Sequence, residues 1–544
     1  MTPATTLPEV VATGRPASPG FALGPVHWLA APATSDRLPG PPAQERAALD
    51  RAILEAIAEI DALAAKSKGA GADVLEFQSA VLADGALRAP ALERISGGQS
   101  AHAAWSQALT EHMADYQSSD DEHFRARATD LADLRDRVLR RLCGQSAPPT
   151  LPPGAIIAAD DLTPSQFLEA DWSQGGAIAL AAGSASSHVA MLARSLGVPM
   201  VVDLGRQPFE RHSAALVVGA RGRVVLSPGE RERAAFLRDQ TAAGRQRADE
   251  QAALSRPAAT RDGVVLSILI NIAGPQDLKT IDAASCDGIG LFRTELMFRD
   301  GEPLPDEEQH YRAYAACLAW AGGKPVTIRT LDIGGDKPIR GLTQAGESNP
   351  FLGTRGIRLM LARPDVFRVQ LRALARAAVH GDLKVMLPMV TLPAELTAAG
   401  GLFDQAVRDL TRENIACRRP PLGIMIEVPA AAIMAARFTE AAFFSIGSND
   451  LTQYVMAASR DTPAVASFNE GAPEAVLYLM ASTVASARAL GIDVSLCGDL
   501  AGNSTALRAL LKTGLRSFSV SAAALGHVKH ALAGLTLGGP DGQS

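Results

Sequence analysis

Two arginines and two carboxylates lie where short apolar stretches end in the second half of the chain. Arg293 and Arg329 each close such a stretch, and Glu427 and Asp450 follow two later ones. Guanidinium groups match phosphate oxygens through paired hydrogen bonds. Carboxylates are the hard oxygen ligands that Mg²⁺ accepts. Together these residue types predict a site for a phosphorylated carboxylic acid and a divalent cation.

Cys497 ends another apolar stretch, in the run SLCGDLAG of residues 495–502. A cysteine in such a place is either a buried packing residue or a thiol that exchanges a proton with a carbon of the bound ligand. We favour the second interpretation because neighbouring strand ends also carry polar residues.

His188 follows the serine-rich run GSASS of residues 183–187 and precedes a segment with helical apolar spacing. The serines resemble a helix N-cap, so His188 is predicted in the first turn of a helix, where free N–H groups and the positive dipole end favour an anion. Most histidines are structural, and the residue alone would be interpreted that way. A phosphorylated imidazole would nevertheless be well placed here.

The elements that must position these residues form two patterns. From residue 264 onward, eight short apolar strands in about 280 residues predict a (β/α)8 barrel, whose chemistry gathers at the carboxyl ends of its strands. The strands are expected at residues 264–271, 288–291, 326–330, 385–389, 423–427, 443–447, 494–497 and 517–520. The residues at their ends are Asn271, Arg293, Arg329, Asp332, Glu427, Asn449, Asp450 and Cys497.

The first half of the chain predicts a compact α/β domain around His188, interrupted by a helical insertion. Helical windows are expected at residues 80–87 and 130–141, and an exposed connecting helix at 230–251. The expected domains are residues 1–35 with 146–229 (α/β), 36–145 (helical), 230–257 (linker helix) and 258–544 (barrel).

The composition of the chain excludes or disfavours several classes of protein. The chain has 544 residues, 47% hydrophobic and 20% charged, with a net charge of −6. This excludes a mainly disordered chain, and the charge gives no reason to expect nucleic acid or membrane as a partner. The five cysteines form no CxxC pair, which argues against disulfides and a zinc site. No membrane insertion and no signal peptide are expected, so the predicted location is the cytoplasm.

Seven motifs in order resemble those of one family. They are ASPG (17–20), DLTPS (161–165), SHVAMLAR (187–194), GIGLFRTE (288–295), NPFLG (349–353), FSIGSNDLTQY (444–454) and CGDLAG (497–502). The chain thereby resembles phosphoenolpyruvate-protein phosphotransferase, Enzyme I of the bacterial sugar phosphotransferase system. The resemblance implies a swivelling phosphohistidine α/β domain with a helical insertion, followed by a TIM-type barrel.

By this resemblance His188 accepts the phosphoryl group and Cys497 protonates the departing enolate to give pyruvate. The implied ligands of phosphoenolpyruvate are Arg293, Arg329 and Arg460, with Asn349, Arg355 and Asn449 around them, and Lys337 nearby. Glu427 and Asp450 match the Mg²⁺ ligands. The helical insertion, with Glu76 and residues 127–130, is expected to dock the carrier protein HPr, and residues beyond about 260 to form a homodimer.

The sequence departs from the family pattern at a few places. Ser184 stands where a glycine is usual, and Asp499 replaces the glutamate of Cys-Gly-Glu. The spacing from Glu427 to Asp450 is one residue shorter than expected, and Gln78 lies near a position that is usually acidic. These changes bear on turnover and carrier specificity.

Three alternatives remain at this level. A dikinase such as phosphoenolpyruvate synthase shares both domain types but adds an ATP-grasp domain, for which the chain shows neither length nor motif. A signalling or scaffolding protein that only binds phosphoenolpyruvate is disfavoured because the acceptor, metal and acid residues are all retained. A nitrogen-regulatory branch is the third, and the sugar branch is favoured because no GAF-like domain precedes Ala17.

Overall fold

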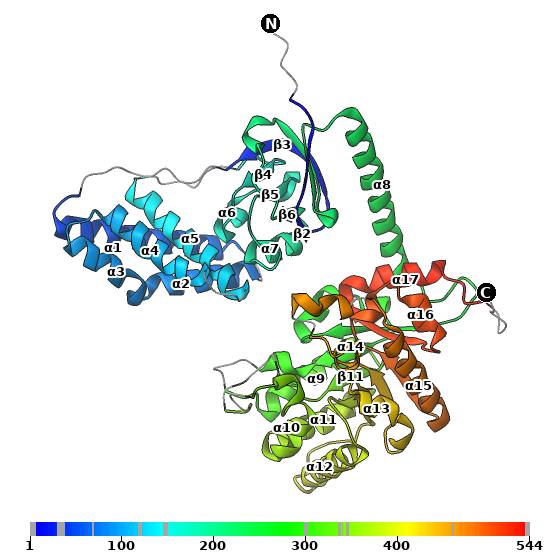
Figure 1. Cartoon of the computed structure of the whole chain (residues 1–544). Helices are drawn as coiled ribbons and strands as arrows, with labels where there is room; N and C mark the ends of the chain where they lie inside the picture. Colours follow the sequence, from blue (N-terminus) through cyan, green and yellow to red (C-terminus); the bar gives the residue numbers. More distant parts are fainter. Residues whose placement is uncertain are drawn as a thin grey trace. The chain divides into compact units, whose positions relative to one another are not determined.

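The computed structural model divides the chain into two compact units, Met1–Ala243 and Gly244–Ser544 (Figure 1). The structure describes residues 7–29, 39–67, 70–117, 122–144, 151–298, 303–335, 339, 341–343, 347–459, 462–469 and 471–538.

The first unit contains an eight-stranded sheet with the order β1-β8-β7-β3-β4-β5-β6-β2. The strands are β1 (Val10–Thr13), β2 (Arg15–Ser18), β3 (Phe21–Trp28), β4 (Ile156–Ala159), β5 (Ala177–Leu180), β6 (Met200–Val202), β7 (Ala214–Val218) and β8 (Arg223–Leu226). Strands β3 to β6 are parallel, and the other pairs are antiparallel. Because β3 pairs directly with β4, the helices between them in sequence are an insertion, as predicted.

In the described residues between β3 and β4, five helices form this insertion. They are α1 (Pro42–Ala64), α2 (Ala70–Ala83), α3 (Gly85–Ser96), α4 (Ala101–Gln117) and α5 (Glu122–Leu142). Leu49, Ile53 and Ile60 of α1 recur at helical spacing and pack in one core with the fully buried Trp105. The helical window predicted at 80–87 is interrupted at Asp84, because its carboxylate accepts the Ala86 N–H at 2.9 Å and starts a new helix.

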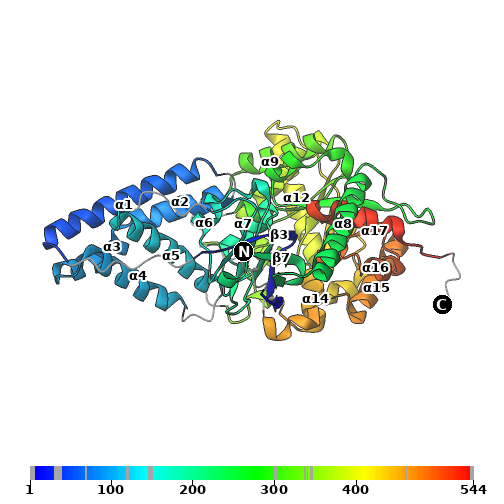
Figure 2. The same ribbon diagram turned by 90° about the horizontal axis from the view of Figure 1, so that it is seen from above.

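Two short helices, α6 (Pro164–Glu169) and α7 (His188–Leu196), lie between the sheet and the inserted helices (Figures 1 and 2). Helix α7 starts at His188, as its serine-rich approach predicts, and the Ser187 hydroxyl accepts the Ala190 N–H at 3.2 Å. The helix ends at Gly197, whose left-handed backbone (φ 69°) favours glycine. This placement puts the ring of His188 at the layer where the sheet and the insertion meet.

The second unit is a closed barrel of eight parallel strands, which confirms the fold class. They are β9 (Ser267–Ile272), β10 (Ile289–Arg293), β11 (Val326–Arg329), β12 (Leu383–Leu387), β13 (Leu422–Ile426), β14 (Phe443–Ile446), β15 (Asp493–Leu496) and β16 (Ser517–Ser521). The surrounding helices are α9 (Glu307–Ala321), α10 (Ile357–Ala362), α11 (Pro364–Ala377), α12 (Pro393–Arg412), α13 (Pro429–Ile433), α14 (Ser448–Met456), α15 (Glu474–Leu490), α16 (Leu507–Lys512) and α17 (Leu525–Gly534).

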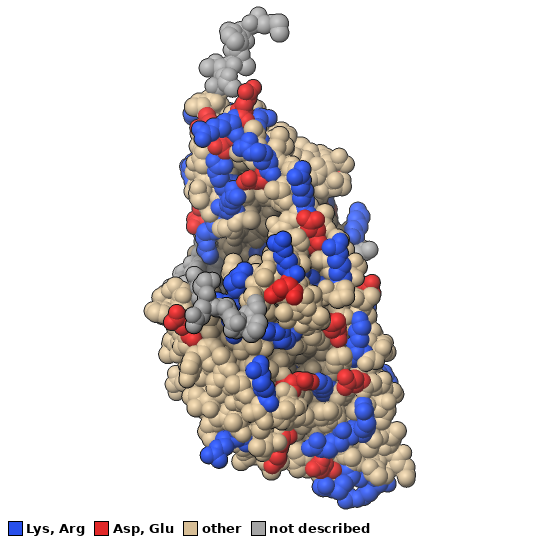
Figure 3. All heavy atoms as spheres, turned by 90° about the vertical axis from the view of Figure 1, so that its right-hand side faces the viewer, with Lys and Arg blue, Asp and Glu red and all other residues tan. Residues whose placement is uncertain are grey.

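Helix α8 (Glu230–Ala253) begins in the first unit and ends in the second, and it contains the predicted connecting helix. Its last part is tied to α17, where His527 Nδ1 lies 2.7 Å from Glu250 Oε1. Charged side chains of both signs are interspersed on the face of the molecule shown in Figure 3. Among the helices that the structure describes, none is both long and apolar enough to cross a membrane.

Candidate active site

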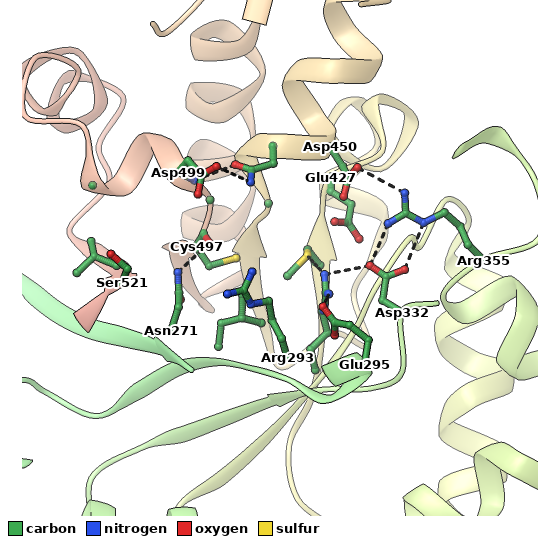
Figure 4. Close-up of a pocket in the computed structure, with 18 residues that line it drawn as sticks. Asn271, Arg293, Glu295, Asp332, Arg355, Glu427, Asp450, Cys497, Asp499 and Ser521 are labelled. Atoms are coloured by element: carbon green, nitrogen blue, oxygen red, sulfur yellow. Dashed lines mark hydrogen bonds and ion pairs between the residues drawn. The ribbon is translucent and has the colours of Figure 1, made fainter. Parts of the chain in front are cut away.

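A polar pocket opens at the carboxyl ends of the barrel strands (Figure 4). Its described lining includes Asn271, Arg293, Glu295, Arg329, Asp332, Arg355, Met425, Glu427, Asn449, Asp450, Cys497, Gly498, Asp499 and Ser521. Strand-end residues that are far apart in sequence therefore meet in one place, because parallel strands of a closed barrel all end at the same rim.

Arg329 and Arg355 are held by alternating carboxylates. Arg329 lies 2.7 Å from Glu295 and 3.1 Å from Asp332. Arg355 lies 3.0 Å from Asp332, with Asp450 at 3.5 Å. All five side chains are at most 10% exposed, so the two guanidinium groups are fixed before any ligand arrives.

Arg293 and Asn449 also line the pocket, but their surroundings differ from those of the two buried arginines. Arg293 is exposed at the last position of β10, with its side chain beside the pocket. Asn449, at the start of α14, donates to Asp499 at 2.9 Å and accepts the Asp499 N–H at 2.8 Å. The aspartate that departs from the family pattern thus forms a reciprocal pair with a predicted ligand-binding residue. Sequence reasoning gave no role to Asp499 or Glu295, although both lie within recognised motifs.

Glu427 and Asp450 bring two carboxylates into the pocket, and carboxylate oxygens are the ligands that Mg²⁺ accepts. Burial raises the pKa of Glu427 to about 8, with further increase from the nearby negative charges of Asp450 and Asp332. Among the described residues lining the pocket, five carboxylates oppose three arginines. A divalent cation between Glu427 and Asp450 would relieve this repulsion and favour an anionic ligand, so the donor set fits Mg²⁺. In the part of the chain that the structure describes, no cluster of three or more metal-ligating side chains was found.

Cys497 lies immediately after β15, buried to 5% exposure, and its thiol donates to the carbonyl of Ile446 at 3.4 Å. Burial raises the pKa of this thiol to about 11. Its proton therefore stays in place at neutral pH, as a general acid requires. The following residue must be a glycine, because a Cβ atom on Gly498 would collide with the Ser448 side chain and backbone at the start of α14.

Two predicted ligand residues are not in the described pocket. Asn349 is exposed on the loop before a short 3-10 turn (Pro350–Leu352) and does not line the pocket. That loop is tied to α14 through Tyr454, whose hydroxyl donates to the Phe351 carbonyl at 2.6 Å. Arg460 and Lys337 lie outside the residues that the structure describes.

His188 occupies a separate site in the first unit. Its side chain is 32% exposed, and Nδ1 lies 3.1 Å from an oxygen of Asp130 on α5. Ser184, which replaces the usual glycine, hydrogen-bonds Ser186 through their hydroxyls at 2.8 Å and accepts the Ser186 N–H at 3.1 Å. The substituted serine thus helps to order the approach to the helix.

Asp130 belongs to the segment 127–130 that is expected at the carrier-docking surface, and this expectation stays a prediction. This residue is only 5% exposed, and its carboxylate contacts the ring of His188. Glu76 is exposed on α2, whereas Gln78 is buried and donates to Asp133 at 3.1 Å. The contact between Asp130 and His188 was not predictable from the sequence, because the two residues are 58 positions apart on elements whose packing no local pattern specifies.

Comparisons with known proteins decide the family. Three profiles match: "PEP-utilising enzyme, N-terminal" over residues 13–127, "PEP-utilising enzyme, mobile domain" over 151–222, and "PEP-utilising enzyme, PEP-binding domain" over 247–537. The phosphoenolpyruvate-protein phosphotransferase of Geobacillus stearothermophilus is 35% identical over 525 residues, covering 94% of this chain and 91% of the relative. The chain belongs to the phosphoenolpyruvate-protein phosphotransferase family. This confirms the resemblance recognised from the seven motifs.

Two further members of the phosphoenolpyruvate-protein phosphotransferase family illustrate the range of similarity. The protein of Enterococcus faecalis is 35% identical over 495 residues, covering 88% of this chain and 86% of its own. That of Haloferax volcanii is 40% identical over 416 residues, covering 75% of this chain and 72% of the relative. The profile of a PEP-binding domain covers the barrel, and the profile of a mobile domain covers the segment that contains His188.

Proposed function

We propose that this chain transfers the phosphoryl group of phosphoenolpyruvate to Nε2 of its own His188 and then to a histidine of an HPr-like carrier. The observation that carries the proposal is the barrel pocket, in which arginines, paired carboxylates and a buried protonated thiol converge in a member of this family. Each of these groups answers one requirement of the reaction.

Arginines at the barrel mouth bind and orient the anionic substrate. Arg329 and Arg355 are buried and fixed by carboxylates, while the exposed Arg293 is free to follow the phosphoryl group. Phosphoryl transfer depends mainly on positioning and on neutralising charge, which such groups supply. We assign Asn449 to the same ligand shell, and we extend the assignment to Asn349 and Arg460.

Cys497 is assigned to the protonation of the enolate that remains after phosphoryl transfer. When the phosphoryl group leaves, an enolate remains, and the thiol gives its proton to the terminal carbon to form pyruvate. Because pyruvate in its keto form is far more stable than its enol, this protonation makes the loss of the phosphoryl group effectively one-way.

Glu427 and Asp450 are the residues that would hold Mg²⁺. A bound Mg²⁺ supplies positive charge for the substrate oxygens. We expect Glu427→Gln to lower turnover at least about 100-fold while the barrel stays folded, because the amide keeps the shape but loses the charge. Turnover titrated with MgCl₂ checks this, and Glu440→Gln, on the exposed surface, is the matched control. Wild-type turnover and Mg²⁺ dependence in Glu427→Gln would exclude Glu427 as a ligand.

We assign the docking site of the carrier protein to the first unit. The partly exposed ring of His188 lies on the same helix as two exposed apolar side chains, Met191 and Leu196, and α2, which packs on α7, exposes Phe77. Exposed apolar groups near a reactive residue favour a protein partner. We further propose that copies of the chain pair through the barrel unit, which sedimentation with ligand and Mg²⁺ would test.

The decisive experiment measures phosphoenolpyruvate consumption with and without a carrier. We expect about one pyruvate per chain without carrier, and continuous turnover when HPr is added. Running a sugar-branch carrier beside a nitrogen-branch carrier tests the branch, for which we favour sugar uptake. Binding of phosphoenolpyruvate without any pyruvate release would instead identify a sensor or scaffold.

A further inference from the structure

The ring of His188 is held by a carboxylate from another layer of the first unit. Both oxygens of Asp130 lie within hydrogen-bond distance of Nδ1, at 3.2 and 3.1 Å. His188 begins α7, whereas Asp130 lies on α5 of the inserted helices. The Asp130 side chain is 7% exposed, compared with 32% for the histidine. The carboxylate that holds the ring is therefore buried, while the His188 side chain remains partly exposed.

This contact determines which ring nitrogen carries the proton. An ionised carboxylate only accepts hydrogen bonds, so Nδ1 must be the donor. A neutral imidazole has a single N–H, and Nε2 then keeps its lone pair. The geometry selects the tautomer in which Nε2 is the nucleophile.

We propose that Asp130 is a positioning residue that fixes the tautomer and orientation of His188 for phosphoryl transfer at Nε2. This inference rests on the proposed function and deepens it. It gives the helical insertion a part in the chemistry in addition to carrier docking.

The transfer step balances without any proton leaving the ring. The lone pair of Nε2 forms the N–P bond, and the bond between phosphorus and the enol oxygen breaks with its electron pair on the enolate. The ring keeps its Nδ1 proton and becomes positively charged, next to the negative charge of Asp130. When the carrier takes the phosphoryl group, the N–P bond breaks and the neutral Nδ1–H tautomer returns. One carboxylate thus serves both the loaded and the unloaded ring.

The position of Asp130 is itself secured by its neighbours on α5. The Thr129 hydroxyl donates to Asp161 at 3.1 Å, Asp133 accepts the Ser165 N–H at 3.1 Å, and Arg137 donates to Glu169 at 2.8 Å. Helical spacing places Asp130, Asp133 and Arg137 on one face of α5. This face of α5 contacts the segments that follow β4. These contacts hold α5 in the position that places the Asp130 carboxylate next to His188.

The test combines a spectroscopic signature with kinetics on the full-length chain. Protein labelled with ¹⁵N-histidine reports the tautomer of His188 through two-bond ¹H–¹⁵N correlations. The wild type is expected to show Nδ1–H. Asp130→Ala is expected to shift the ring toward Nε2–H. In Asp130→Asn the amide oxygen still accepts the Nδ1 proton, so the Nδ1–H tautomer is retained.

Phosphoryl exchange between His188 and the carrier supplies the second readout. Asp130→Ala is expected to slow exchange at least about 10-fold, with Asp130→Asn in between. This is the lower end of the roughly 10–100-fold loss that follows removal of the carboxylate partner of a metal-ligating histidine. Asp136→Ala is the matched control, since it removes another carboxylate of α5, which pairs with Arg135 at 2.7 Å and is not one of the contacts that hold Asp130 in place. It is expected to leave the tautomer of His188 unchanged.

Three results would overturn the proposal. The first is an unchanged tautomer in Asp130→Ala, and the second is a changed tautomer with normal exchange. The third is an equal loss of exchange with the same tautomer change in Asp136→Ala, which would assign the effect to packing of α5. If the wild type itself takes no phosphoryl group from phosphoenolpyruvate, the proposed function fails instead. The two failures are therefore distinguishable.

Discussion

Replacement of His188 by alanine is expected to abolish labelling of the protein by ³²P-phosphoenolpyruvate and Mg²⁺. Three observations single out this histidine: it begins a helix capped by Ser187, its side chain is 32% exposed, and its Nδ1 faces a carboxylate. A helix N-terminus stabilises the negative phosphoryl group, and the exposed ring allows access to a partner. The expected loss is complete, because the label is held by a covalent bond to the ring that the substitution removes.

The control for this experiment is His102→Ala, which removes a histidine from α4 of the inserted helices. It should label as the wild type does. Acid treatment adds a chemical check, since a phosphoryl group on nitrogen is lost in acid whereas a serine ester survives. Normal, acid-labile labelling of His188→Ala would place the acceptor on another histidine.

Cys497→Ala is expected to keep the affinity for phosphoenolpyruvate but to lose pyruvate formation at least about 100-fold, the usual scale of general acid catalysis. In the proposed mechanism the thiol moves a proton and the arginines hold the anion. Calorimetry measures the first quantity and pyruvate release the second. Cys417→Ala is the matched control, because that partly exposed cysteine is not among the residues lining the pocket.

The same residue predicts a pH dependence. Burial raises the pKa of Cys497 to about 11, so the thiol carries its proton at every pH below that value. Since the protonated form is the donor, pyruvate formation should show no loss from this group across the neutral range and should fall only as pH approaches 11. A decline with an apparent pKa near 8 that disappears in Cys497→Ala would contradict the buried, protonated thiol.

Much of the architecture was predictable from local patterns. Eight short apolar strands separated by helix-sized segments indicate a parallel barrel, because each strand is buried on both faces and needs a crossover connection. The serine run before His188 predicts a capped helix start, which α7 confirms. Element boundaries were less accurate where one side chain decides the outcome, as at Asp84, whose cap divides α2 from α3.

The candidate site was predictable only in part. Residues such as Arg329, Glu427 and Cys497 follow apolar stretches directly, so barrel geometry predicts that they share one rim. The ion-pair and hydrogen-bond partners of the pocket residues could not be predicted in this way. The pairing of Arg355 with Asp332, or of Asn449 with Asp499, depends on the path of each loop and on close approaches such as that of Gly498 to Ser448.

The residue types of the candidate site could be predicted from the amino-acid sequence alone: a helix-start histidine, strand-end arginines, two carboxylates and a thiol in family order. Those features are local, because capping, strand periodicity and motif spacing act over a few residues. The protonation of these side chains depends on the tertiary structure. Burial within the barrel raises the pKa values of Glu427 and Cys497, and the packing of α5 against α7 brings Asp130 to Nδ1 of His188. Desolvation and long-range contacts depend on everything that surrounds a group, which no window of sequence contains.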